Sequence, residues 1–589
     1  MAYNSYKEDE KSVEKSKLQT LKRLLLYLLK YKWTIVLVLI LMGYCVVVSL
    51  INPLIIESAI DNHIGNKDYI GLYKLLIIAL IINLIATFAI KLRMYIMAKM
   101  CNQILLTIRQ ELYTHIQKLG FKFFDSRPTG KILSRIIGDI NSLKDVLPNC
   151  VTTLIPDFIT VCAVVIIMFS KNPKLAVAAL ISTPFMAIAI TMIQVKAHPR
   201  WQTFRKKSSN LNAFLHEDMS GMKIIHSFTA EKETEETFDE LLNEHKSSFR
   251  SAVRLSDCFG SVIDFSWGFG CVALYFIGIV VLKDENISVG TFLAFGTYIN
   301  MFWQPINNLS NFYNQITTNI AGAERIFEIL DTKPEIEDEK GVVDLPDIKG
   351  EVTFDHVTFG YDEEKVLDDV SFVIKPGETI AIVGPTGAGK STIINLISRF
   401  YDANEGRVLL DGYDVKDVSI ESLRKQVGTM TQENFIFSGT VKDNIRYGKL
   451  DATDEEIIEA AKAVNAHEFI MKLDKGYDTE LLERGGGLSI GQKQILALAR
   501  TMVSKPKILI LDEATSSIDT KTELIVQKGI DKLLSGRTSF VIAHRLSTIK
   551  RADRIFVVDN GKIIEEGNHR QLLEKKGAYY NLYMAQFNI

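Results

Sequence analysis

Long apolar stretches fill the first half of the chain, whereas short ones alternate with polar segments in the second half. Six of the long stretches reach the length of about 20 residues that a helix needs to cross a bilayer. They run approximately over Trp33–Leu54, Leu72–Leu92, Leu147–Phe169, Leu175–Ile193, Phe259–Leu282 and Val289–Phe312. The last is the weakest because amide side chains interrupt it, at Asn300, Gln304, Asn307 and Asn308. Since a soluble core helix is rarely apolar on all sides for so long, the pattern predicts an all-α domain with six transmembrane helices.

Basic side chains indicate how these helices are oriented. They are numerous before the first stretch and in the second-to-third and fourth-to-fifth connections, whereas the other connections hold only Lys67, Lys171, Lys174 and Lys283. Because Lys and Arg are retained on the cytosolic side of a membrane, both ends of the domain and the two long connections are expected in the cytosol.

The two long connections are about 50 and 65 residues long, well above ordinary loop lengths. Apolar residues nevertheless recur in them at helical spacing, as in Ile104–Leu119. The transmembrane helices are therefore expected to continue into the cytosol. Their tips, near Asp125–Gly130 and Gly221–Ala230, would contact a soluble structure.

Two carboxylates fall within the apolar stretches. Asp157 lies inside the third stretch and Asp264 near the inner end of the fifth. A charge in hydrocarbon costs about 3 kcal/mol or more, so such residues mark possible functional positions. Asp157 either contacts a transported substrate or is a paired or water-satisfied group between helices. Asp264 is expected at the membrane interface.

A charged, Pro-containing segment follows the membrane domain, and short β-branched strands then alternate with helical segments from Val352 onward. This alternation predicts an α/β domain. The expected organisation is a cytosolic N-terminal segment over residues 1–32, a transmembrane domain over 33–320, a linker over 321–347 and the α/β domain over 348–589.

Composition narrows the function classes. The chain is 47% hydrophobic, which excludes disorder, and its 68 basic and 70 acidic side chains leave a net charge of −2 that gives no argument for nucleic acid as a partner. None of the six cysteines forms a C-x-x-C pair, so thiolate metal sites and thioredoxin chemistry lack their spacing. The polar first 32 residues do not predict a cleavable signal peptide.

A phosphate-binding loop is the clearest motif. The strand Thr379–Val383 leads into a G-x-x-x-x-G-K-[ST] pattern, and a helical segment, Thr392–Arg399, follows. The expected ATP-binding residues here are Gly384, Pro385, Thr386, Gly387, Ala388, Gly389, Lys390, Ser391 and Thr392. The glycines let backbone N–H groups approach phosphates, Lys390 supplies positive charge at the β- and γ-phosphates, and the Ser391 hydroxyl can ligate Mg²⁺.

Acidic residues end a later strand. The apolar run Lys507–Leu511 is followed by Asp512 and Glu513, and His544 follows the strand Thr538–Ile542. Asp512 can hold Mg²⁺ through water, and Glu513 can polarise the attacking water. His544 is in a position to contact the γ-phosphate.

The segment Leu488-Ser489-Ile490-Gly491-Gln492 resembles the signature motif of ABC transporter ATPases. Other features of that family occur in the expected order. They are Tyr361 as the A-loop aromatic that stacks on adenine, Gln432 as the Q-loop glutamine, Glu480–Gly485 before the signature, Ser517–Asp519 at the D-loop and His544 as the switch histidine. The resemblance covers essentially the whole chain, because six spans ahead of one ATPase is the half-transporter layout of ABC exporters.

The resemblance implies a two-chain machine with ATP and Mg²⁺ as its cofactors. ATP would lie between the phosphate loop of one chain and Ser489, Gly491 and Gln492 of the other. Gln432 would ligate Mg²⁺ and sense the membrane domain, and Glu513, His544, Gln432 and Lys390 would act in hydrolysis. The helical tips would be coupling helices that dock on the ATPase near Gln432.

Ile490 departs from the family pattern, which has glycine there. A β-branched residue restricts the backbone and crowds the approach to the opposing chain's ATP. A heterodimer with one degenerate site accounts for this departure, because the partner would supply a normal signature to this chain's intact catalytic residues. The alternative is a symmetric homodimer that tolerates Ile490.

The leading functional hypothesis is ATP-driven export of hydrophobic or amphipathic compounds, such as drugs or lipids, across a bacterial cytoplasmic membrane. An ATP-gated channel or regulatory subunit and an importer on the same fold are the alternatives. A peptide-processing exporter is disfavoured because only about 32 residues precede the first span, too few for a protease domain. Asp157 is a weak indication of cationic cargo.

Overall fold

The computed structural model describes residues 17–282, 287–338, 341–361, 364–431, 434–513, 520–543 and 546–587. Two compact units divide the chain. The first contains the residues up to Ile116 together with Gly130–Asp331. The second contains Gln117–Thr129 and the residues from Thr332 onward, so a short piece of the predicted helical domain belongs to the α/β unit.

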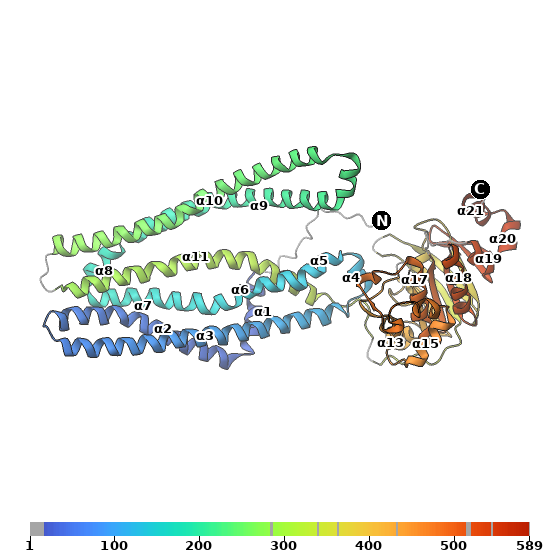
Figure 1. The fold of residues 1–589 in the computed structure, drawn as a ribbon, viewed down its shortest axis with the longest axis horizontal. Coiled ribbons are helices and arrows are strands. Elements are labelled where there is room, and N and C mark those ends of the chain that lie inside the picture. The colour runs from blue at the N-terminus through green and yellow to red at the C-terminus, as the bar shows by residue number, and fades with distance from the viewer. Residues whose placement is uncertain are drawn as a thin grey trace. The chain divides into compact units, whose positions relative to one another are not determined.

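The first unit is helical (Figure 1). Its α-helices are α1 (Lys17–Leu29), α2 (Lys32–Ser58), α3 (Tyr69–Ile116), α5 (Thr129–Ser134), α6 (Ile140–Asn149), α7 (Ile155–Lys171), α8 (Pro173–Leu180), α9 (Thr183–Phe228), α10 (Glu231–Phe276) and α11 (Val289–Asp331). Short π-helical turns adjoin several of them, at Ala59–Ile64, Arg135–Asp139, Cys150–Leu154 and Ile277–Leu282.

Among the described residues, five helical stretches are long and apolar enough to cross a membrane: Lys32–Ile64, Tyr69–Ile116, Thr152–Lys171, Pro173–Phe228 and Glu231–Val281. They contain the first, second and fourth predicted spans and overlap the third and fifth, of which the third was predicted to begin at Leu147 and the fifth to end at Leu282. The sixth prediction falls on α11, which is a helix over its whole length but is not among the five. The lengths of α3, α9 and α10 confirm that helices fill most of the two long connections.

The helices of the first unit leave much apolar surface exposed. On α3, for instance, Leu84 and Phe88 are about two-thirds exposed, at 67% and 65%. Such surface is stable when hydrocarbon covers it, as expected of membrane spans. The buried contacts lie between helices, where Met168 of α7, Leu175 of α8 and Tyr298 of α11 join one cluster.

The second unit combines two main sheets. An antiparallel sheet has the order β2-β1-β4-β5, with β1 Val352–Phe359, β2 Leu367–Ile374, β4 Glu405–Leu410 and β5 Tyr413–Asp414. A six-stranded sheet has the order β12-β11-β3-β10-β9-β6, with β3 Thr379–Val383, β6 Val427–Met430, β9 Ile508–Glu513, β10 Thr538–Ala543, β11 Arg554–Asp559 and β12 Lys562–Gly567. The short strands β7 (Gly439–Thr440) and β8 (Glu480–Leu481) pair separately. The expectation of an α/β domain is confirmed.

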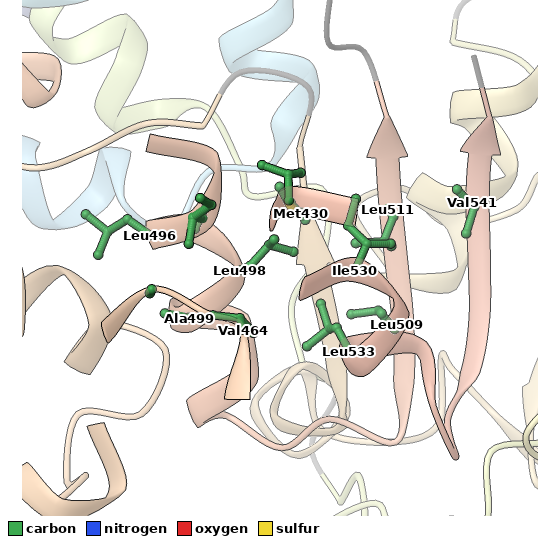
Figure 2. Close-up of a cluster of buried hydrophobic side chains, with 14 of the residues drawn as sticks. Met430, Val464, Leu496, Leu498, Ala499, Leu509, Leu511, Ile530, Leu533 and Val541 are labelled. Carbon is green, nitrogen blue, oxygen red and sulfur yellow. The ribbon is translucent and has the colours of Figure 1, made fainter. Parts of the chain in front are cut away.

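Helices cover the six-stranded sheet. They include α12 (Lys390–Ile397), α17 (Ile490–Val503), α18 (Thr520–Leu534) and α19 (Leu546–Arg551). The second unit also contains the helices α13 (Ile420–Gln426), α14 (Val441–Arg446), α15 (Asp454–Ala463), α16 (His467–Ile470), α20 (His569–Lys575) and α21 (Ala578–Phe587). Figure 2 shows Leu498 of α17 and Ile530 of α18 packed with Leu509 and Leu511 of β9. This buried layer fixes the carboxyl ends of the strands, where the predicted site residues lie.

Candidate nucleotide site

The phosphate-binding loop joins β3 to α12. Gly389 has a φ of +105°, and a Cβ there would lie 2.8 Å from the Leu367 Cδ2 atom. At Gly384 a Cβ would lie 2.1 Å from the Val558 carbonyl oxygen. Only glycine fits these two positions, because a side chain would collide with buried neighbours. The backbone thereby turns tightly into the N-terminus of α12, a geometry that suits a phosphate group.

Lys390 begins α12 and turns back over the loop. Its Nζ atom donates hydrogen bonds to the carbonyl oxygens of Gly384 and Pro385, at 2.8 and 2.7 Å. Burial lowers the pKa of the Lys390 ammonium, and the charge of Asp512 opposes that effect. A polyphosphate would supply the negative charge that this partly desolvated cation lacks.

Asp512 of β9 lies beside this loop because β9, β10 and β3 are neighbouring parallel strands whose carboxyl ends are in register. It is paired with Ile542 of β10, which is in turn paired with Ile382 of β3, two residues before Gly384. Ser391 is exposed at the start of α12. A hydroxyl and a carboxylate are hard oxygen donors of the kind that Mg²⁺ binds, so these residues fit the ion.

Several predicted residues cannot be placed. Glu513 ends β9 in register with Ala543, but its side chain is not described. Gln432, His544 and Ser517–Asp519 lie outside the described residues. Their roles in hydrolysis stay predictions.

Tyr361, the predicted adenine-stacking residue, is anchored to α12. Its hydroxyl lies 3.2 Å from the Thr392 Oγ1 atom and accepts a hydrogen bond from the Asn395 side chain at 3.4 Å. Its ring meets those of Phe359 and Tyr401 edge to face, with centroids 5.0 Å apart in both cases. Sequence reasoning missed Asn395 and Tyr401, which carry no motif of their own.

The predicted signature residues begin α17. Ser489 accepts a hydrogen bond from the Gln492 backbone N–H at 3.2 Å, and the Gln492 side chain accepts one from the Ser489 N–H at 2.8 Å. This capping box satisfies two backbone donors at the helix start. Gly491 is buried, and Ile490 points outward with 58% of its surface exposed.

The segment Gln117–Thr129 packs against the α/β unit through the short helix α4 (Phe121–Asp125). The Phe121 and Phe400 rings have centroids 4.4 Å apart, and the Tyr401 hydroxyl donates to the Asp125 carboxylate. This confirms that the first helical tip contacts the soluble domain. The second tip lies where Thr229, with a φ of +54°, separates α9 from α10 (Figure 1).

The two intramembrane carboxylates differ in environment. The Asn308 side chain of α11 donates a hydrogen bond to Asp157 of α7 at 3.1 Å, which is the pairing between helices considered above. Asp264 is exposed on α10. Neither arrangement identifies a substrate contact.

Known proteins match both halves of the chain. The model of the ABC transporter transmembrane region matches residues 33–306, and that of the ABC transporter matches residues 367–516. An uncharacterized ABC transporter ATP-binding protein, YknV of Bacillus subtilis (strain 168), is 42% identical over 96% of this chain and 94% of its own length. A putative multidrug export ATP-binding/permease protein of Staphylococcus aureus (strain NCTC 8325 / PS 47) is 37% identical over 96% of this chain and all of its own. The structure of a bacterial Atm1-family ABC exporter with ATP bound superimposes with a TM-score of 0.78 and 28% identity, over 94% of this chain and 98% of the other.

Proposed function

The chain belongs to the ABC transporter family as an exporter-type half-transporter of the bacterial cell membrane, and from this premise we propose that it exports hydrophobic or amphipathic small molecules. ATP hydrolysis in its second unit is coupled to that transport by alternating access. The observation that carries the proposal is the phosphate-binding loop, with Lys390 turned over it and Asp512 beside it, in a chain that also spans the membrane.

Each residue of the proposed ATP site has a separate task. Tyr361 stacks on adenine, residues 384–392 hold the phosphates, and Lys390 neutralises their charge. Ser391, Gln432 and, through water, Asp512 hold Mg²⁺, which neutralises negative charge on the phosphate oxygens. Glu513 polarises the attacking water and His544 contacts the γ-phosphate.

Exporters of this kind function as dimers, and exposed apolar side chains in the first unit support a surface for the partner. Ile224 and Phe228 are 65% and 79% exposed at the tip of α9, which the charge pattern places in the cytosol, where lipid cannot cover them. In the dimer, Ser489, Gly491 and Gln492 would face the partner's ATP. The exposed Ile490 would crowd that ATP, which favours a heterodimer whose partner carries the normal signature.

The ATPase activity of the chain purified alone in lipid nanodiscs tests both parts of the proposal. Glu513→Gln serves as the blank, and Ile490→Gly restores the family residue. For a heterodimer we expect activity near the blank that rises at least tenfold in Ile490→Gly. Activity well above the blank without that substitution would show that a homodimer is competent.

Transport is tested after the active dimer has been reconstituted into lipid vesicles, because nanodiscs enclose no compartment. Reconstituted vesicles are loaded with hydrophobic dyes and with anionic lipid analogues, and ATP-dependent movement is compared with the Glu513→Gln blank. Robust hydrolysis without movement of any such compound would contradict export of this substrate class.

A further inference from the structure

Tyr401 connects the segment Gln117–Thr129 to the nucleotide site. It lies shortly after α12 and is only 7% exposed. Its hydroxyl donates a hydrogen bond to the Oδ2 atom of Asp125 at the end of α4. Burial and the neighbouring Asp125 raise the pKa of Tyr401, so the phenol stays protonated and remains a donor throughout the physiological range.

The ring of Tyr401 contacts the proposed adenine-stacking residue. It meets Tyr361 edge to face at 90°, with centroids 5.0 Å apart, and Phe359 at 5.6 Å. The Tyr361 hydroxyl lies 3.2 Å from the Thr392 hydroxyl, directly after Ser391 in the phosphate-binding loop. A continuous series of contacts therefore runs from Asp125 through Tyr401 and Tyr361 to α12.

These aromatic side chains also border open space. A cavity of about 190 Å³ is lined by Lys122 of α4, Glu335 of the linker, and Tyr361, Tyr401 and Asp402 of the ATPase. Tyr401 belongs to the buried cluster of this unit and Tyr361 packs against that cluster, so each ring borders the cavity with only part of its surface. Their orientation depends on a few specific contacts, and the hydrogen bond to Asp125 is one of them.

We propose that Tyr401 is a positioning residue, through which docking of residues 117–129 sets the orientation of Tyr361 and raises the affinity of the site for the adenine end of ATP. This proposal rests on the proposed role of Tyr361 in ATP binding, and it adds regulation of that binding by residues 117–129. Because coupling between two sites is reciprocal, bound ATP strengthens the docking of the segment to the same extent.

Nucleotide binding to the full chain in nanodiscs tests the proposal. All proteins carry Glu513→Gln, so the result does not depend on hydrolysis, on transport or on the choice between homodimer and heterodimer. The dissociation constants of ATP and of inorganic triphosphate are compared, because triphosphate reaches the phosphate loop but has no adenine. Tyr401→Phe removes only the hydroxyl, and Tyr413→Phe is the matched control at a half-exposed tyrosine of β5.

We expect Tyr401→Phe and Asp125→Ala each to weaken ATP binding about fivefold, at the low end of measured couplings between sites, with triphosphate binding and the control within twofold. Asp125→Asn, which retains an acceptor oxygen, should stay near the parent. In a Tyr361→Ala background the Tyr401→Phe effect should disappear. Equal weakening of ATP and triphosphate, an effect that survives Tyr361→Ala, or no effect at all would each overturn the proposal.

Failure of the wider function is distinguishable from failure of this one. If Tyr361→Ala itself leaves ATP binding unchanged, the adenine role of Tyr361 is wrong and the positioning role falls with it. If Tyr361→Ala weakens ATP binding but Tyr401→Phe does not, the adenine role stands and only the link to Asp125 is refuted.

Discussion

Single side chains in the second unit show how burial decides which protonation state the fold favours. Burial disfavours the charged form of Lys390 and lowers its pKa. The negative charge of a bound phosphate would stabilise the ammonium and offset this effect. His569, at the start of α20, is a second partly buried group of this unit. Burial and the charge of Lys550 lower its pKa, and the Tyr579 hydroxyl lies 2.6 Å from its Nδ1 atom. Because burial raises the pKa of Tyr579 to about 12, the phenol stays protonated and is able to donate to neutral His569.

Acidification should therefore loosen the contact between α20 and α21. A histidine whose folded-state pKa lies below its ordinary value of about 6.5 contributes stability that is present above pH 6.5 and is lost as the pH falls through the lowered pKa. We expect amide hydrogen exchange in residues 578–585, corrected for intrinsic rates, to be faster at pH 5 than at pH 7.5. His569→Gln, which cannot be protonated, should flatten this difference, and an unchanged pH dependence in that variant would assign the effect to another group.

At the scale of elements, an aromatic contact with Phe400, a hydrogen bond from Tyr401 and an ion pair with Glu335 hold α4. Phe121 and Phe124 are both partly exposed, at 45% and 41%, but only Phe121 contacts the Phe400 ring. The Arg424 guanidinium also lies over the Phe400 ring, 5.1 Å from its centroid. An aromatic pair of this kind contributes about 0.5–1.5 kcal/mol beyond its buried area.

Phe121→Ala should therefore weaken the docking of α4 and reduce the stimulation of ATPase activity by transported compounds severalfold, while basal activity at saturating ATP stays within twofold. The measurement compares stimulated and basal rates of the active dimer in nanodiscs. Phe124→Ala is the matched control, since it removes the same ring from the same helix. Equal loss of stimulation in both variants would mean that α4 as a whole, and not the Phe400 contact, carries the effect.

Local sequence patterns predicted the helices, strands and loops better than they predicted the contacts between distant residues. The phosphate-binding loop was predictable because strand, loop and helix are contiguous from Thr379 to Ile397, and the apolar stretches because lipid requires their composition. A contact of the tip near Asp125 was expected, but its partner Tyr401 was not, since 276 positions separate the two residues and Tyr401 stands in no recognisable pattern. The reciprocal amide hydrogen bonds between Asn52 of α2 and Asn83 of α3, both 3.0 Å, are a second contact of this type.

For the whole molecule, the proposed alternating access requires the outer ends of the membrane helices to part and rejoin. The charge pattern places the end of α2 and the start of α11 on the outside, and several hydrogen bonds join them there. Asp61 accepts a hydrogen bond from the Gly290 N–H at 2.9 Å, and Glu57 accepts one from the Thr291 hydroxyl at 2.9 Å. Glu57 also pairs with Lys171 at the end of α7, at 2.8 Å, with only 14% of the carboxylate side chain exposed.

Removing the charge of Glu57 should shift the transporter toward its outward-open state. A partly buried ion pair of this kind is worth about 1 kcal/mol, or roughly a fivefold change in the equilibrium between states. Because ATP favours the closed ATPase dimer, which in this family accompanies the outward-open state, Glu57→Gln should lower the ATP concentration for half-maximal hydrolysis up to about fivefold. Lys171→Met should have the same effect, and the double variant no larger one, since both substitutions remove a single interaction. Lys174→Met removes a neighbouring positive charge and serves as the control. A Glu57→Gln variant with unchanged ATP dependence, or one matched by Lys174→Met, would show that this ion pair does not hold the outer side closed.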